Sequence, residues 1–147
     1  MLNQNIISLA LKLAKKSSEN NEIPVGCVIF DKKGDIISSS YNSTLKNNDP
    51  TAHAEILAIR KACKKLKIKK LVDFSIFTTL EPCKMCEHAI YHAGIKQIFF
   101  GAYSENFKIF KNKEKNYHYE ISGYQYYGGM EEKKCSELIK LFFKKKR

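Results

Sequence analysis

Apolar positions along the chain follow two different periods, one typical of helices and one of buried strands. In some segments apolar residues recur three or four positions apart, which is the spacing of an amphipathic helix. Between them lie short apolar, β-branched runs bounded by turn residues, which predict buried strands. The helices are expected over residues 3–19, from about 52 to 63 with Thr51 as the N-cap, 83–93 and 130–143. The strands are expected over residues 24–30, 36–41, 74–80 and 96–102.

The order of these elements predicts the fold class. The helix at 83–93 joins two predicted strands, and a strand–helix–strand unit of this kind places the two strands parallel. Residues 103–118 are polar and lysine-rich, and 119–127 form either a short strand or an extended aromatic loop. No repeat or linker divides the chain. We therefore expect a single domain over residues 1–147, with an α/β fold: a three-layer α/β/α sandwich around a mixed central sheet of about five strands.

Composition places the chain among ordinary globular proteins. Hydrophobic residues make up 44% of its 147 residues, and no apolar run reaches the length of a membrane span. No secretory signal is visible at the N-terminus, so we expect a cytoplasmic protein without a membrane partner. In that setting the five cysteines are expected to be free thiols or metal ligands rather than disulfides.

The charge is strongly basic and has two interpretations. A net charge of +11 suits a polyanionic partner such as nucleic acid. The abundance of lysine, asparagine and isoleucine is also typical of a protein encoded by an AT-rich genome, which would give the same charge without such a partner. Charge alone leaves both interpretations open.

Two short motifs carry the candidate chemistry. The first is His53-Ala54-Glu55, and the second is Pro82-Cys83-Lys84-Met85-Cys86; each falls at the predicted start of a helix. Cys83 and Cys86, three positions apart, can turn both sulfurs toward one point. With His53 they give three ligands that suit Zn²⁺, whereas a structural zinc site usually closes with four. The open fourth position predicts a catalytic zinc site with one Zn²⁺ per subunit.

Glu55 is expected to be a catalytic acid–base residue rather than a fourth ligand. On a regular helix, its spacing from His53 points the two side chains apart, so the carboxylate would approach the zinc-activated water from another side. Cys27, Cys63 and Cys135 fall on apolar faces and are expected to be buried free thiols. The remaining histidines, which lie away from both motifs, are not expected to bind the metal: His88, His92 and His118.

The combination of the two motifs resembles the zinc-dependent deaminases of the cytidine deaminase superfamily. Within it, the chain is most similar to the bacterial tRNA-specific adenosine deaminases, and the similarity covers most of its length. The stretches that carry it are Ile23-Pro24-Val25-Gly26, Asp49 to Ile56, Thr79 to Cys86, Phe100-Gly101-Ala102 and the ending Leu141 to Arg147.

The resemblance implies a cytidine-deaminase-like fold and a reaction. Adenosine at the wobble position of a tRNA anticodon loop would be hydrolysed to inosine by zinc-activated water. His53, Cys83 and Cys86 would hold the zinc, Glu55 would transfer protons, and Asn42 would bind the target nucleoside. The partner would be the anticodon stem-loop of tRNA, whose single-stranded bases are accessible. The family also implies a homodimer.

Two departures from the family and two alternative functions remain. Ser104 stands where the family usually has aspartate; residues 105–116 are shorter and lysine-rich, and 123–129 look expanded. One alternative is a guanine deaminase or another free base or nucleoside deaminase, because the segment from Asn48 to Glu55 also resembles guanine deaminases. The other is a non-catalytic, zinc-stabilised RNA-binding module, in which Glu55 would be dispensable.

Overall fold

The computed structural model describes residues 1–107 and 123–146. Its elements, in chain order, are α1 (Gln4–Glu19), β1 (Gly26–Phe30), β2 (Ile36–Tyr41), α2 (Ala54–Leu66), β3 (Ser75–Leu80), α3 (Lys84–His92), β4 (Gln97–Ala102), the 3-10 turn η1 (Ser104–Asn106), β5 (Gln125–Tyr127) and α4 (Glu132–Lys145).

The strands form one mixed sheet in the order β2-β1-β3-β4-β5. β1 pairs antiparallel with β2 and with β3, whereas β4 pairs parallel with β3 and with β5. The predicted parallel pairing across the strand–helix–strand unit is therefore confirmed. The antiparallel pairing of β1 with β2 comes from the tight hairpin between them, and the parallel pairing of β3 with β4 comes from the crossover through α3.

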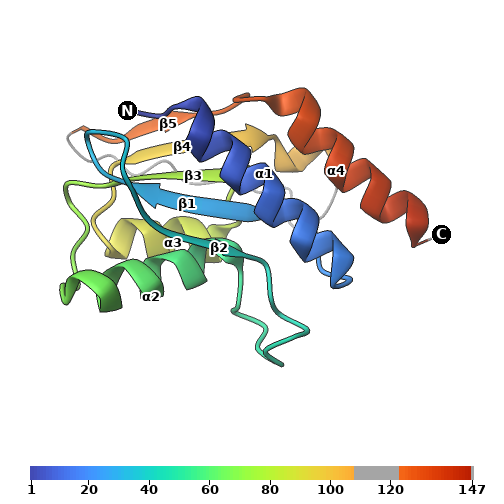
Figure 1. Ribbon diagram of the computed structural model, residues 1–147, viewed down its shortest axis with the longest axis horizontal. Coiled ribbons are helices and arrows are strands. Elements are labelled where there is room, and N and C mark those ends of the chain that lie inside the picture. The colour runs from blue at the N-terminus through green and yellow to red at the C-terminus, as the bar shows by residue number, and fades with distance from the viewer. Residues whose placement is uncertain (108–122, 147) are drawn as a thin grey trace.

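Helices cover both faces of this sheet, which confirms the predicted three-layer α/β/α sandwich (Figure 1). α1 and α4 pack on one face, and α2 and α3 pack on the other. Because both sides are covered, β1 and β3 are buried at every position, in contrast to the alternation of a half-exposed strand. In residues 1–107 and 123–146, none of the helices combines the length and apolar character that crossing a membrane would require.

Some element boundaries differ from those expected. The second helix begins at Ala54 rather than near Ala52, and the last begins at Glu132 rather than at 130. Of the possible strand over residues 119–127, the final part is β5, while 119–122 lie outside the described ranges. These differences are small, but the first of them leaves His53 just before the helix instead of inside it.

The pairing directions bring several chain segments to one edge of the sheet. β3 and β4 both end there, at Leu80 and Ala102, because they are parallel. β1 is antiparallel to β3, so it begins at this edge, and β2 ends beside it with Tyr41 opposite Gly26. The loops that follow or precede these four strands therefore meet at a single place.

Gly26 marks a close approach between β1 and α1, and a side chain there is expected to destabilise the fold. A Cβ at this position would lie 1.9 Å from the carbonyl oxygen of Ala10 and 2.9 Å from the backbone nitrogen of Ala14. These are backbone atoms, so α1 as a whole would have to move. We expect Gly26→Ala to lower the free energy of unfolding by about 1–3 kcal/mol or more. Urea denaturation measures this; an unchanged midpoint would mean that α1 moves outward at no cost.

Candidate metal centre and active site

One histidine and two cysteines lie together at this edge of the sheet. His53, Cys83 and Cys86 each offer a ligand atom, and these atoms all lie within 4.8 Å of one another. The Nδ1 atom of His53 is 3.6 Å from Cys83 Sγ and 3.4 Å from Cys86 Sγ. One imidazole and two thiols are donors that Zn²⁺ favours, and three protein ligands are typical of a catalytic zinc site.

Two helix N-termini supply these side chains. Cys83 is the N-cap of α3, with Cys86 in its first turn, and His53 is the N-cap of α2 with extended backbone angles (φ −72°, ψ 151°). The expectation that His53 lies in the first helical turn, with Thr51 as the cap, is therefore wrong. The N–H groups at the start of α3 lack helical partners, and their partial positive charge favours thiolates.

The ionisation of the three groups is mutually dependent. A hydrogen bond from Cys86, together with one from His53, lowers the pKa of the Cys83 thiol to about 4. Donating that hydrogen bond raises the pKa of the Cys86 thiol, and burial raises it further. The hydrogen bond with Cys83 raises the pKa of His53. A divalent cation bound here would take the place of these protons, because its charge stabilises both thiolates beside a neutral imidazole.

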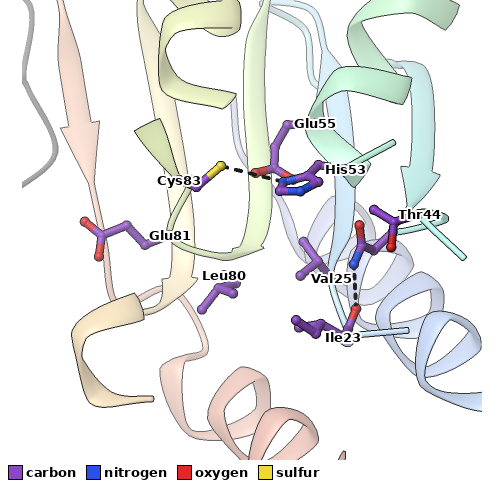
Figure 2. A pocket seen from close by; sticks show the side chains of 9 residues that line it. Ile23, Val25, Thr44, His53, Glu55, Leu80, Glu81 and Cys83 are labelled. Carbon is purple, nitrogen blue, oxygen red and sulfur yellow. Dashed lines mark hydrogen bonds between the residues drawn. The ribbon is translucent and has the colours of Figure 1, made fainter. Parts of the chain in front are cut away.

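Glu55 is a buried carboxyl group that faces the same cavity as His53 (Figure 2). Its side chain is 4% exposed. Burial raises the pKa of Glu55 to about 7, and the negative charge of Cys83 contributes to the rise. Helical spacing does not point Glu55 away from His53, because His53 precedes the helix. A carboxyl group with a pKa near neutrality is suited to both accepting and releasing a proton.

A cavity of about 110 Å³ adjoins these groups, and Asn42 forms part of its wall. The backbone N–H of Asn42 donates to the carbonyl oxygen of Val25 (3.1 Å), and its Nδ2 lies 3.5 Å from the carbonyl oxygen of Ile23. Its Oδ1 atom is buried and has no hydrogen-bond partner among the described residues. An unpaired acceptor at a cavity wall is a place where a ligand N–H can bind.

A comparison of the sequence with known protein families identifies the family to which this chain belongs. Residues 2–102 match the family model for the cytidine and deoxycytidylate deaminase zinc-binding region. The chain belongs to this family of zinc-dependent deaminases. The predicted resemblance and the predicted zinc cofactor are thereby confirmed.

Relatives of this deaminase match most of its length. The tRNA-specific adenosine deaminase of Rickettsia bellii (strain RML369-C) is 41% identical, over 94% of this chain and 97% of its own. A solved structure from a study of A-to-I editing by tRNA:A34 deaminases at the wobble position of transfer RNA is 32% identical, with a TM-score of 0.77, over 92% of this chain and 99% of its own. The guanine deaminase of Bacillus subtilis is 40% identical, with a TM-score of 0.67, over 72% of this chain and 68% of its own. The predicted cytidine-deaminase-like fold is confirmed.

Sequence reasoning missed a second carboxylate at the cavity of this deaminase. Glu81 lines the cavity, and its Oε1 atom accepts hydrogen bonds from the backbone N–H (3.1 Å) and the hydroxyl (3.0 Å) of Ser104. Its Oε2 atom accepts one from the hydroxyl of Tyr126 (2.8 Å). Ser104, which departs from the usual aspartate, thus anchors the segment after β4 to the segment before α3. The sequence held no signal of this, because the three residues come from distant parts of the chain.

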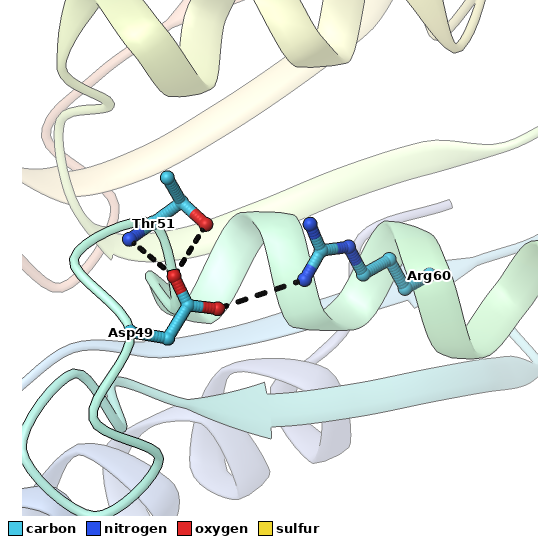
Figure 3. A network of polar contacts seen from close by, with 3 residues as sticks. All are labelled: Asp49, Thr51 and Arg60. Carbon is cyan, nitrogen blue, oxygen red and sulfur yellow. Dashed lines mark hydrogen bonds and ion pairs between the residues drawn. The ribbon is translucent and has the colours of Figure 1, made fainter.

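A turn stabilised by Asp49 holds the segment that leads to His53 (Figure 3). Asp49 Oδ1 accepts hydrogen bonds from the Thr51 N–H (2.8 Å) and hydroxyl (2.7 Å), and Oδ2 lies 3.9 Å from Arg60 Nη1. The hydrogen bonds from Thr51 lower the pKa of Asp49. The His53 N–H in turn donates to the carbonyl oxygen of Thr51 (2.8 Å). Thr51 therefore closes a turn, instead of capping α2.

Within residues 1–107 and 123–146, the other cysteines and histidines do not belong to this cluster. Cys27 and Cys135 are buried free thiols, as predicted, but Cys63 is only half-buried, because it lies at the border of the apolar face of α2. The cluster of candidate ligands among the described residues includes neither His88 nor His92. The prediction for His118 lies outside the described residues.

Proposed function

We propose that this protein hydrolyses adenosine to inosine at the wobble position of a tRNA anticodon loop. The observation that carries the proposal is the cluster of His53, Cys83 and Cys86 beside a cavity that Glu55 also lines, and whose wall includes the buried amide oxygen of Asn42. The relatives named tRNA-specific adenosine deaminase support this substrate, because their similarity spans nearly the whole of both chains.

In this proposal His53, Cys83 and Cys86 hold one zinc ion. A zinc ion in such a site supplies the nucleophile, because it lowers the pKa of its water to about 7. Asn42 accepts a hydrogen bond from the target nucleoside and orients it in the cavity. Glu55 takes a proton from the attacking water and delivers it to the amino group at C6 of adenine. That group leaves as ammonia, and the oxygen of the water remains on the base.

The test uses the zinc-loaded protein and an anticodon stem-loop with adenosine at the wobble position. Separate reactions contain free adenosine, guanine and cytidine, and a stem-loop whose adenosine stands at another loop position. We expect inosine only from the wobble adenosine, detected by mass spectrometry of nuclease digests. Turnover of a free base or nucleoside, without turnover of the stem-loop, would overturn the proposal.

A second candidate function is guanine deamination, which the 40% identity to the Bacillus subtilis guanine deaminase favours. That similarity covers 72% of this chain, against 94% for the Rickettsia bellii enzyme. A non-catalytic RNA-binding module accounts less well for a buried carboxyl group beside the candidate ligands. The same set of reactions separates all three functions.

The proposal includes a cytoplasmic location, a tRNA partner, a single deaminase domain over residues 1–147 and a homodimer. Exposed apolar side chains on and near α3 support the dimer, among them Val72 (57% exposed), Met85 (38%) and Tyr91 (37%). Sedimentation equilibrium measures the assembly. A monomer at concentrations where the enzyme is active would contradict the dimer.

Removal of residues 144–147 is expected to weaken tRNA binding mainly at low salt. These residues are three lysines and an arginine. A hollow of about 520 Å³ is lined by Lys15, Lys145 and Lys146 together with Leu141 and Phe142. If the cations contact phosphates, the slope of log K against log salt should become shallower by about 1–3. Binding of the stem-loop across a salt series measures this slope.

The matched control is Lys32→Ala with Lys33→Ala, at the turn between β1 and β2, which lies at the opposite edge of the sheet from the cavity. We expect this variant to keep the salt dependence of the intact protein. If truncation leaves the slope unchanged, the basic ending is a solvated helix end whose lysines suit the helix dipole.

A further inference from the structure

Glu22 is a buried carboxylate just beyond the end of α1. Its side chain is 2% exposed, although a charged group next to a helix end is usually in water. Asn21 adopts the left-handed conformation (φ 61°), and the Glu22 N–H then donates to the carbonyl oxygen of Ser17 (3.0 Å). This reversal of the chain brings the carboxylate of Glu22 against the loop that follows β2.

Three consecutive residues of that loop donate to this one carboxylate. Oε2 accepts a hydrogen bond from the Thr44 hydroxyl (3.0 Å). Oε1 accepts from the backbone N–H of Leu45 and from that of Lys46 (3.3 Å). Hydrogen bonds to an ionised acceptor are among the strongest in proteins. The segment 44–46, which we call the rim segment, is therefore held at three points by Glu22.

The rim segment borders the active-site cavity. Thr44 lines the cavity and is labelled beside Ile23 and Val25 in Figure 2. Leu45 points into solvent with 67% of its surface exposed. The hydroxyl of Ser17 lies 3.0 Å from the carbonyl oxygen of Ile23 and 3.1 Å from that of Asn42. Both walls on this side of the cavity are thus tied to the last turn of α1.

Burying the Glu22 carboxylate costs free energy that the rim segment does not return through apolar burial. A carboxylate loses hydration when it is buried, and water could satisfy the three donors of an exposed loop equally well. Leu45 gains no burial from the arrangement, so the loop adds little apolar stabilisation in return. What the contacts do achieve is a fixed position for the loop beside the cavity before any substrate arrives.

We propose that Glu22 is a positioning residue that sets the rim segment for substrate RNA; this rests on the proposed function and extends it. Glu22 does not touch the reacting atoms. It holds the backbone of the rim segment so that Thr44 and Leu45 meet the nucleotide entering the cavity in one arrangement. A loop that is ordered beforehand lowers the free-energy cost of binding. Loss of the carboxylate should therefore act mainly on KM, and much less on kcat.

The test compares Glu22→Ala, Glu22→Gln and Glu19→Ala in the zinc-loaded protein. Glu22→Ala should raise KM for the wobble-adenosine stem-loop by about tenfold or more, with a smaller change in kcat. It should also speed hydrogen exchange at the backbone amides of Leu45 and Lys46 by about tenfold, measured by NMR without RNA. In Glu22→Gln the side-chain oxygen can still accept from the rim segment, and the side-chain amide can donate to the Thr44 hydroxyl. Its KM should therefore stay close to that of the unchanged protein.

Glu19→Ala is the matched control, since it removes the same charge from an exposed position three residues away. It should leave KM no higher than that of the unchanged protein. If Glu22→Ala does not fold, Glu22→Asp, whose arm is one carbon shorter, tests the same two changes. Unchanged exchange would show that Glu22 does not hold the rim segment. Faster exchange with unchanged KM would show that the rim segment does not position substrate. Either result overturns the inference. If the unchanged protein leaves the stem-loop unreacted, the proposed function is overturned instead. The exchange measurement remains valid in that case, because it is made without RNA.

Discussion

Replacement of Glu55 by glutamine is expected to leave zinc bound while turnover falls by about 10²–10⁴-fold, the usual contribution of a positioned acid–base group. The amide has the size of the carboxyl group and fills the same buried space, so the proposed ligands His53, Cys83 and Cys86 should keep their arrangement. It cannot take a proton from water at neutral pH. The loss should therefore appear in kcat and not in metal content.

Single-turnover rates on the stem-loop and zinc content by atomic emission measure the two effects separately. Glu87→Gln is the matched control, because it changes another buried glutamate (1% exposed), whose Oε1 atom accepts from the Tyr124 hydroxyl (3.4 Å). We expect this control to keep most of its turnover. Equal activity of Glu55→Gln and the unchanged protein would remove Glu55 from the mechanism.

Replacement of Cys86 by alanine is expected to abolish both zinc binding and turnover. Its Sγ atom is 3.4 Å from His53 Nδ1 and its side chain is fully buried, so no solvent-exposed group can move in to take its place. Two remaining ligands do not make a zinc site of the catalytic type, which needs three. The thermal midpoint should also fall, because metal binding stabilises the folded state by mass action.

Zinc content after dialysis, the thermal midpoint and turnover test this variant together. Cys63→Ala is the matched control, since it removes a half-buried thiol from α2 outside the candidate ligand cluster. It should keep its zinc and its activity. If Cys86→Ala retained zinc and turnover, the ligand set proposed from His53, Cys83 and Cys86 would be wrong.

The two predictions differ in what they would show if they failed. Failure of the Glu55 prediction would leave an active zinc site whose acid–base group is a residue other than Glu55. Failure of the Cys86 prediction would question the metal site itself. Because zinc content does not depend on the substrate, the metal part of both predictions can be judged even if the substrate is a free base, whereas turnover must then be measured on that base.

The layers of the fold and the donor types of the metal site can be predicted from the residues alone. The apolar period separates helices from strands, and the crossover through residues 83–93 requires parallel strands on either side. The donor types in His53, Cys83 and Cys86 are a property of the residues themselves, so their suitability for zinc is visible before any folding. The motif also identifies Glu55 as the candidate acid–base residue, but helical spacing does not point it away from His53, because His53 precedes α2.

The placement of these groups around the cavity depends on contacts between distant segments, which form only in the folded chain. His53 precedes α2, and this places Glu55 on the same cavity rather than away from it. Ser104 and Tyr126 meet Glu81 across the sheet edge, where the ends of parallel strands gather. Glu22 looks like the polar end of a helix in the sequence, yet its burial against residues 44–46 arises from a reversal at Asn21 and a loop more than twenty residues away. No local sequence pattern predicts such contacts, because water could satisfy the hydrogen-bonding groups of each residue equally well.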